Sequence, residues 1–89
     1  MKTEQITIKN KLGLHARAAA KLVGTASHFD AEVKLQKGTH EVNGKSIMGV
    51  MMLAASKGSK INITTDGDDE TPALDAIVKL INNRFEEAE

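Results

Sequence analysis

The apolar residues of this 89-residue chain switch repeatedly between an alternating and a helical spacing, and this switching constrains the fold more than any other feature. Ile6 and Ile8 alternate with polar residues, as in a half-buried strand. A helix is expected from Ala16, because the next apolar residues repeat with the spacing of one helical face. That face comprises Ala19, Leu22, Val23 and Ala26. The chain therefore opens with a strand and a helix.

The middle of the chain predicts a hairpin and a further strand. Residues 31–36 alternate in polarity, the pair Lys37-Gly38 forms a turn, and Val42 marks a shorter return strand. Residues 60–64 alternate in the same way, so a fourth strand is expected there.

Two more helices complete the pattern. Ser46 suits the N-cap of a brief helix in which Val50 and Leu53 face the core, and Gly58 ends this segment. Acidic residues and Pro72 precede a longer amphipathic helix. Its apolar face comprises Leu74, Ile77, Val78, Ile81 and Phe85. The element order is then strand, helix, strand, strand, helix, strand, helix.

This order predicts the α+β class, with an open-faced β-sandwich in which a four-stranded antiparallel sheet is covered on one face by three helices. Periodicity alone does not fix the strand order, and a ferredoxin-like arrangement of the same elements fits equally well. No repeat, low-complexity tract or linker divides the sequence. A single domain over residues 1–89 is therefore expected.

Composition excludes several functional classes. Twelve basic and twelve acidic residues give a formal net charge of zero, so no general attraction to nucleic acid or an anionic membrane is expected. The chain has no cysteine, which excludes a disulfide framework and a thiolate zinc site. No stretch approaches the ~20 apolar residues of a membrane span, and the start does not resemble a signal peptide. We therefore expect a cytoplasmic protein without membrane insertion.

His15 is the leading candidate for chemistry. It stands where a loop gives way to a helix, a position that usually prefers Ser, Thr, Asp or Asn. The free N–H groups of Ala16 and Arg17, with the positive end of the helix dipole, suit a phosphate-sized anion. The Arg17 guanidinium can hold phosphate oxygens, and its charge favours the neutral, nucleophilic imidazole. Gly13 allows a tight turn, while Ala16 and Ala20 leave the helix face open to a partner.

The alternative is that His15 is an ordinary exposed histidine, which is the commoner role at the end of a loop. His28 follows the first helix and His40 follows the hairpin turn, and neither is assigned a function. Neither is flanked by histidines or paired carboxylates at a metal-binding spacing. We therefore expect no metal and no cofactor.

Residues 43–53 predict a surface for docking to another protein. The side chains turned away from the core in the short helix form a soft apolar patch, whereas Met52 is expected to be buried. The patch comprises Ile47, Met48 and Met51. Ser46 needs no explanation beyond its role as an N-cap. A phosphate on Ser46 would nevertheless add negative charge beside the patch and repel a partner.

The segments LGLHARAAAKLV and VNGKSIMGVMMLAASKG resemble the histidine-containing phosphocarrier proteins, HPr, of the bacterial phosphoenolpyruvate-dependent phosphotransferase system. The resemblance spans nearly the whole chain and implies the open-faced sandwich. It also implies phosphorylation of His15 at Nδ1, with Arg17 stabilising the phosphoryl group. The implied donor is enzyme I and the implied acceptor is an enzyme IIA. The KSIMG run is similar to that of relatives in which HPr kinase/phosphorylase modifies Ser46.

Some positions depart from the common pattern of the family. Many members have proline where this chain has Ala18 and glycine where it has Ala54, and neither change threatens the transfer chemistry. Gly24, Ser27 and Gly49 stand where some relatives have lysines that meet acidic partner surfaces. The choice of partner is therefore left open.

Three functional hypotheses follow. The first is a monomeric relay protein, not an ordinary enzyme, that accepts a phosphoryl group from enzyme I and passes it to an enzyme IIA. The second is a mainly regulatory protein. Either its important state is phosphoserine at Ser46, or it is a carrier in nitrogen or carbon control that is not coupled to sugar uptake. The third is a module that binds RNA or a small effector. It would need aromatic residues or a basic face, and two phenylalanines with balanced charge supply neither.

Overall fold

The computed structural model describes residues 1–87, and its elements follow the order that the periodicity predicts. A short 3₁₀ helix, η1, follows the last α-helix. The elements are β1 (Lys2–Thr7), α1 (Ala16–Ala26), β2 (Glu32–Lys37), β3 (His40–Asn43), α2 (Ile47–Met52), β4 (Lys60–Asp66), α3 (Glu70–Asn82) and η1 (Arg84–Glu86).

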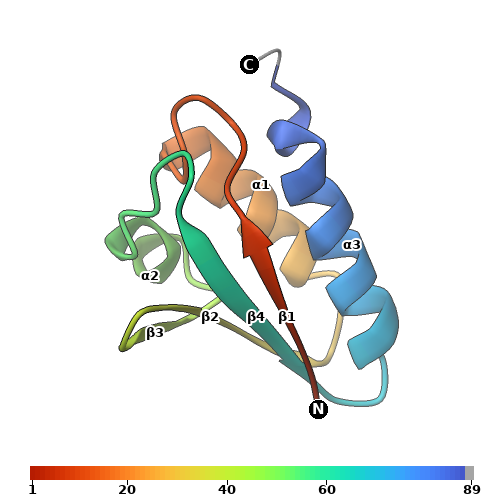
Figure 1. The fold of residues 1–89 in the computed structure, drawn as a ribbon. Helices are drawn as coiled ribbons and strands as arrows, with labels where there is room; N and C mark the ends of the chain where they lie inside the picture. The colour runs from red at the N-terminus through yellow and green to blue at the C-terminus, as the bar shows by residue number, and fades with distance from the viewer. Residues whose placement is uncertain (88–89) are drawn as a thin grey trace.

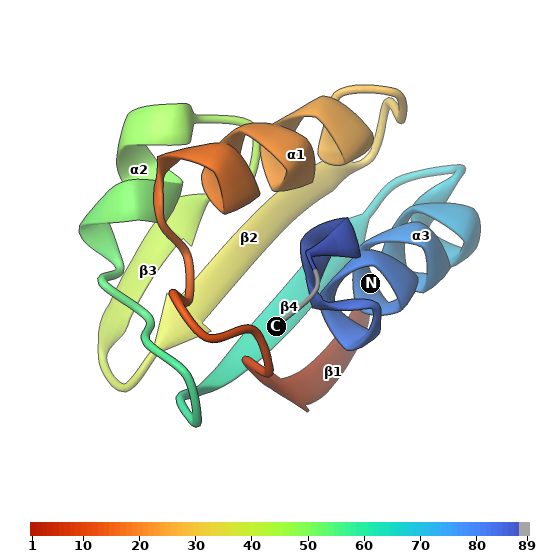
Figure 2. The same ribbon diagram turned by 90° about the horizontal axis from the view of Figure 1, so that it is seen from above.

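The four strands form one antiparallel sheet in the order β1-β4-β2-β3. Helices α1, α2 and α3 cover one face of this sheet, with α1 between the other two (Figures 1 and 2). The open-faced α+β sandwich is therefore confirmed. The strand order, which periodicity left open, is that of this sandwich and not of the ferredoxin-like alternative.

The pairing register of the strands determines which side chains form the core. Leu35 of β2 lies opposite Ile63 of β4, and Ile6 of β1 lies opposite Ile61 of β4. These side chains are buried, whereas the polar residues between them lie on the open face of the sheet. The helices complete the core with Leu22, Val50, Leu74, Ile77 and Ile81.

The last helix ends earlier than its apolar pattern predicts. Helix α3 stops at Asn82, and Phe85 is buried outside it, in η1. Arg84, Phe85 and Glu86 all have positive φ angles of 56°, 54° and 65°, so the backbone turns sharply instead of extending α3. This turn brings the C-terminal segment beside the loop at residues 8–15, at the end of the molecule away from the N-terminus (Figure 1).

Helix α2 is also shorter than the sequence predicts. It ends at Met52, well before Gly58, and Ala54 in the following loop has a φ of 52°. The expectation that Met52 is buried is wrong, since 64% of its surface is exposed. The reason is that α2 has one inward face, which Val50 and Leu53 occupy.

Candidate functional site

His15 is the N-cap of α1, as its place in the sequence predicts. Its backbone is extended, its N–H donates to the Gly13 carbonyl at 2.9 Å, and its carbonyl accepts from the Ala19 N–H at 2.8 Å. The imidazole makes no capping hydrogen bond, and 27% of the side chain is exposed. The side chain is therefore available for another role at the start of the helix.

The loop before His15 is held closely against another part of the chain. Gly13 has a φ of 67°, and a Cβ at this position would lie 2.4 Å from the Ala55 carbonyl oxygen and 2.7 Å from Cα of Ser56. The next residue, Leu14, donates its N–H to the same Ala55 oxygen at 2.9 Å. Only glycine fits both the conformation and the space, so Gly13 fixes the approach of the chain to His15.

The ring of His15 contacts a carboxylate that sequence reasoning missed. Nε2 of His15 lies 2.7 Å from Oε2 of Glu87, whose side chain is 14% exposed. The other oxygen of Glu87 accepts from Nδ2 of Asn10 at 3.1 Å, and Asn10 is completely buried. The same Asn10 amide nitrogen also donates to the Gly13 carbonyl at 2.8 Å. One buried amide thus connects the loop, the C-terminal segment and His15.

The environment of Glu87 favours its ionised form. Lost hydration opposes ionisation, but hydrogen bonds from His15 and Asn10 and the charges of His15 and Arg17 outweigh it. Together these contacts lower the pKa of the Glu87 carboxyl below its ordinary value. A negative charge therefore stands beside the imidazole at neutral pH.

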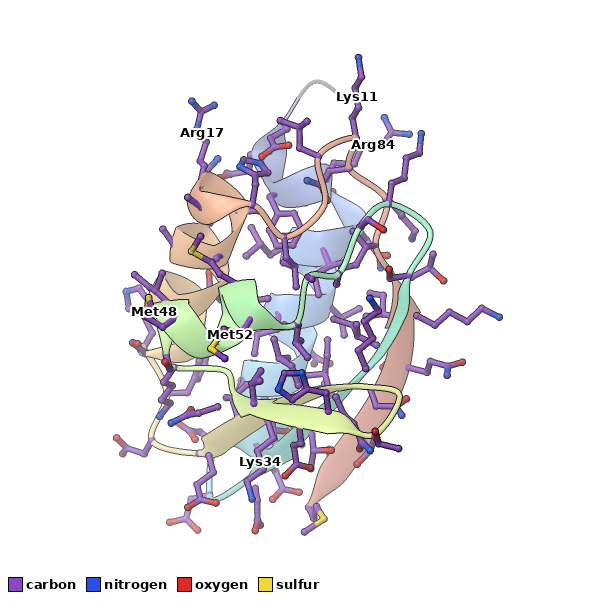
Figure 3. All side chains as sticks on the ribbon, turned by 90° about the vertical axis from the view of Figure 1, so that its left-hand side faces the viewer. Lys11, Arg17, Lys34, Met48, Met52 and Arg84 are labelled. Atoms are coloured by element: carbon purple, nitrogen blue, oxygen red, sulfur yellow. The ribbon has the colours of Figure 1, made fainter. Side chains whose placement is uncertain are left out.

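Arg17 lies in the first turn of α1 and points away from the body of the molecule (Figure 3). Within residues 1–87, no hydrogen bond or ion pair engages its guanidinium. Ala16 and Ala20, one helical turn apart, are exposed on the same helix. The start of α1 thus combines an exposed cation, small side chains and N–H groups that have no partner within the helix.

Helix α2 presents an apolar surface beside α1. Ile47, Met48 and Met51 are 45%, 71% and 40% exposed, as expected, and Met52 adds to this surface (Figure 3). Leu12, which sequence reasoning did not single out, is 67% exposed in the loop before His15. The one feature of the sequence that could have indicated this exposed position is that an apolar residue directly precedes Gly13 in a loop. Exposed apolar side chains therefore occur on both the loop and α2.

Ser46 caps α2 in the predicted manner. Its Oγ accepts the Gly49 N–H at 3.1 Å, and its carbonyl accepts the Val50 N–H at 2.9 Å. The side chain is half-buried. Ser46 directly precedes Ile47 and Met48, so the cap adjoins the apolar surface.

The remaining histidines lie outside this constellation. His28 and His40 are exposed, in the segment after α1 and in β3. Across residues 1–87, no three side chains of the metal-ligating types converge on one point. In the same part of the chain, no helix has the length and apolar character needed to cross a membrane.

Known proteins resemble this chain in sequence and in structure. A family model described as "PTS HPr component phosphorylation site" matches residues 2–83. The phosphocarrier protein HPr of Pseudomonas aeruginosa is 56% identical over 86 residues, which cover 96% of each chain. The crystal structure of HPr from Thermoanaerobacter tengcongensis matches all of both chains with a TM-score of 0.96 and 47% identity. An HPr dimer from that organism matches with a TM-score of 0.79 and 48% identity, covering 98% of this chain and 100% of that chain.

Proposed function

The chain belongs to the HPr family of phosphocarrier proteins, and we propose that it carries a phosphoryl group on Nδ1 of His15. Enzyme I is the donor and an enzyme IIA is the acceptor. The observation that carries this proposal is the placement of the imidazole. It lies at the start of α1 without making a capping hydrogen bond, and its Nε2 is hydrogen-bonded to Glu87. Nδ1 is then the nitrogen available to phosphorus.

The first turn of α1 supports an anion at this position. The N–H groups of Ala16 and Arg17 have no partner within the helix, and the helix dipole favours negative charge there. The exposed Arg17 guanidinium supplies forked donors and a fixed positive charge. In this proposal these groups hold the phosphoryl oxygens both during transfer and in the phosphorylated protein.

The neighbouring surface supports docking of the two partner enzymes. Ala16 and Ala20 keep α1 accessible, and α2 contributes exposed apolar side chains beside it. We assign contact with both partners to Ala16, Ala20, Ile47, Met48 and Met51. Apolar side chains that adapt their shape suit a surface that must bind a donor and an acceptor in turn.

The test is phosphorylation by enzyme I and labelled phosphoenolpyruvate. The expected product carries one acid-labile phosphate on His15, which passes to an added enzyme IIA. His15→Ala should remove the label, and Arg17→Ala should slow its appearance. An unlabelled protein, or a label that survives His15→Ala, contradicts the carrier role.

A second function is regulation at Ser46, for which HPr kinase/phosphorylase is the proposed partner. The half-buried Oγ lies at the start of α2, where the added oxygens would meet backbone N–H groups. The new charge would stand beside the apolar surface and oppose docking. Intact-mass measurement after treatment with this kinase and ATP should show one added phosphate that Ser46→Ala lacks. An unchanged mass contradicts this branch.

The same proposal assigns residues 1–89 to one domain that acts as a cytoplasmic monomer, as a relay protein without a cofactor. The alternative, a mainly regulatory carrier, differs in its acceptor and not in the chemistry of His15. Transfer of label to a series of sugar-specific and regulatory enzyme IIA proteins separates the two. Light scattering during gel filtration tests the monomer, because a dimer would double the measured mass.

A further inference from the structure

We propose that Glu87 is a positioning residue for His15, because its carboxylate keeps the ring proton on Nε2 and balances the positive ring formed when Nδ1 is phosphorylated. This inference rests on the proposed function. It adds a role for a C-terminal side chain that lies outside the two segments carrying the family resemblance.

The contact geometry supports a defined orientation of the imidazole. The carboxylate of Glu87 is ionised and lies 2.7 Å from Nε2, so Nε2 must donate the hydrogen. A neutral imidazole has one proton, and a proton held on Nε2 leaves the lone pair on Nδ1. The bond from Asn10 to the second oxygen prevents the carboxylate from rotating away.

The backbone segment that places Glu87 beside His15 has an unusual conformation. Three successive non-glycine residues, Arg84 to Glu86, have left-handed φ angles, a conformation that costs about 1 kcal/mol or more per residue. Phe85 is fully buried, and its carbonyl accepts from Nζ of Lys21 at 2.8 Å. The Glu87 N–H donates to the Arg84 carbonyl at 3.0 Å. This anchored turn ends with Glu87 against the ring.

The transfer step then proceeds without loss of a proton from the ring. The Nδ1 lone pair forms the new bond to phosphorus, while the bond between phosphorus and the donor's leaving atom breaks and its electron pair passes to that atom. The proton stays on Nε2, so the phosphorylated ring is an imidazolium. The carboxylate beside Nε2 stabilises this cation, and the reverse sequence passes the group to the acceptor.

The experiment compares Glu87→Ala and Glu87→Gln with Glu86→Ala as the matched control. Glu86 is 72% exposed and contacts Lys21, so its removal changes the charge equally without touching His15. Nitrogen-15 spectra of the His15 ring, recorded where it is neutral, report which nitrogen bears the proton. The initial rate of phosphorylation by enzyme I reports the chemistry, and circular dichroism confirms the fold.

The wild-type and Glu86→Ala proteins should show the proton only on Nε2. Glu87→Ala should show a mixture of tautomers and a phosphorylation rate about tenfold lower, the loss expected for one charge-assisted hydrogen bond. The Gln variant can still accept the hydrogen, so it should keep the tautomer and recover only part of the rate.

If Glu87→Ala gives the same nitrogen-15 spectra and the same phosphorylation rate as the wild-type protein, the inference is overturned while the carrier function remains intact. A changed tautomer with an unchanged rate would overturn the positioning role, and a full rate in Glu87→Gln would overturn the role of the charge. An absence of label on the wild-type protein would instead contradict the proposed function itself.

Discussion

His15 and Ser46 are both N-cap residues, yet their side chains are used in opposite ways. The Ser46 hydroxyl accepts a backbone N–H of α2, whereas the His15 imidazole makes no such bond in α1 and turns to Glu87. In the unmodified protein, the Ser46 cap satisfies one free N–H group of α2, whereas the side chain of His15 occupies none of those at the start of α1. This difference leaves the start of α1 the more open of the two to an external anion.

Substitutions at Ser46 should separate its capping role from its regulatory role. Ser46→Ala leaves the Gly49 N–H without its acceptor, so the free energy of unfolding measured in urea titrations should fall by about 1 kcal/mol. Ser46→Asp keeps an N-cap acceptor and should match wild-type stability, while its charge slows phosphorylation of His15 by enzyme I. Equal phosphorylation rates for the Asp variant and wild type would contradict repulsion at this surface.

Ala54 adopts a conformation that suits glycine. Its φ of 52° strains any residue that has a Cβ, and the side chain is exposed, so it contributes little to the core. Ala54→Gly should raise the free energy of unfolding by about 0.5 kcal/mol. Relief of strain in the folded state exceeds the loss caused by the greater conformational entropy of glycine in the unfolded chain. Ala20→Gly in α1 is the control and should lower it by about 1 kcal/mol. Thermal unfolding of both variants measures these opposite signs.

At the scale of elements, the predicted parts are those in which apolar spacing and local signals agree. The start of α1, the cap of α2 and the inward residues of the strands follow from such local patterns. The turn at residues 84–86 does not, because Phe85 continues the helical spacing although its backbone leaves the helix. The contacts of Glu87 with Asn10 and His15 could not be predicted either, since they join residues far apart in sequence without any motif.

Asp69 connects two elements and should make stability depend on pH. Its carboxylate, at the start of α3, accepts the N–H groups of Asp30 and Ala31 at 2.9 and 2.8 Å, just before β2. The N–H of Asp30 is the main cause that lowers the pKa of the Asp69 carboxyl. A lowered pKa means that the stabilisation exists above the pKa of the unfolded state, about 3.9 for aspartate, and disappears as the pH falls through the folded value.

The corresponding variant is Asp69→Asn. We expect it to unfold at lower urea concentration than wild type at neutral pH, and the difference should shrink below about pH 3, where the carboxylates become protonated. Asp68→Asn removes the same charge from an exposed neighbour and should unfold like wild type at neutral pH. If the difference in urea midpoint between Asp69→Asn and wild type stays constant across this pH range, the carboxylate charge is not the cause of the stabilisation.

At the scale of the whole molecule, the open-faced architecture divides the surface into distinct regions. The helices cover one face of the sheet, and the loop before α1 meets the C-terminal segment at one end (Figures 1 and 2). His15, Arg17 and the exposed residues of α2 come from this half of the fold, while the start of α3 lies at the other end. A charge introduced at each end should therefore have a different effect on partner binding.

Met48→Asp tests this division directly. The residue is 71% exposed near the start of α2, where an acidic side chain also suits the helix dipole, so stability should not fall. A negative charge within the apolar surface should lower kcat/KM for phosphorylation by enzyme I by about tenfold or more, as expected for loss of an interface anchor. Thr71→Asp adds the same charge at an exposed position in the first turn of α3 and should leave this rate unchanged. A Met48→Asp rate equal to that of the wild-type protein would show that the methionine surface does not take part in docking. An equal loss of rate in both variants would instead indicate a general effect of charge on the encounter.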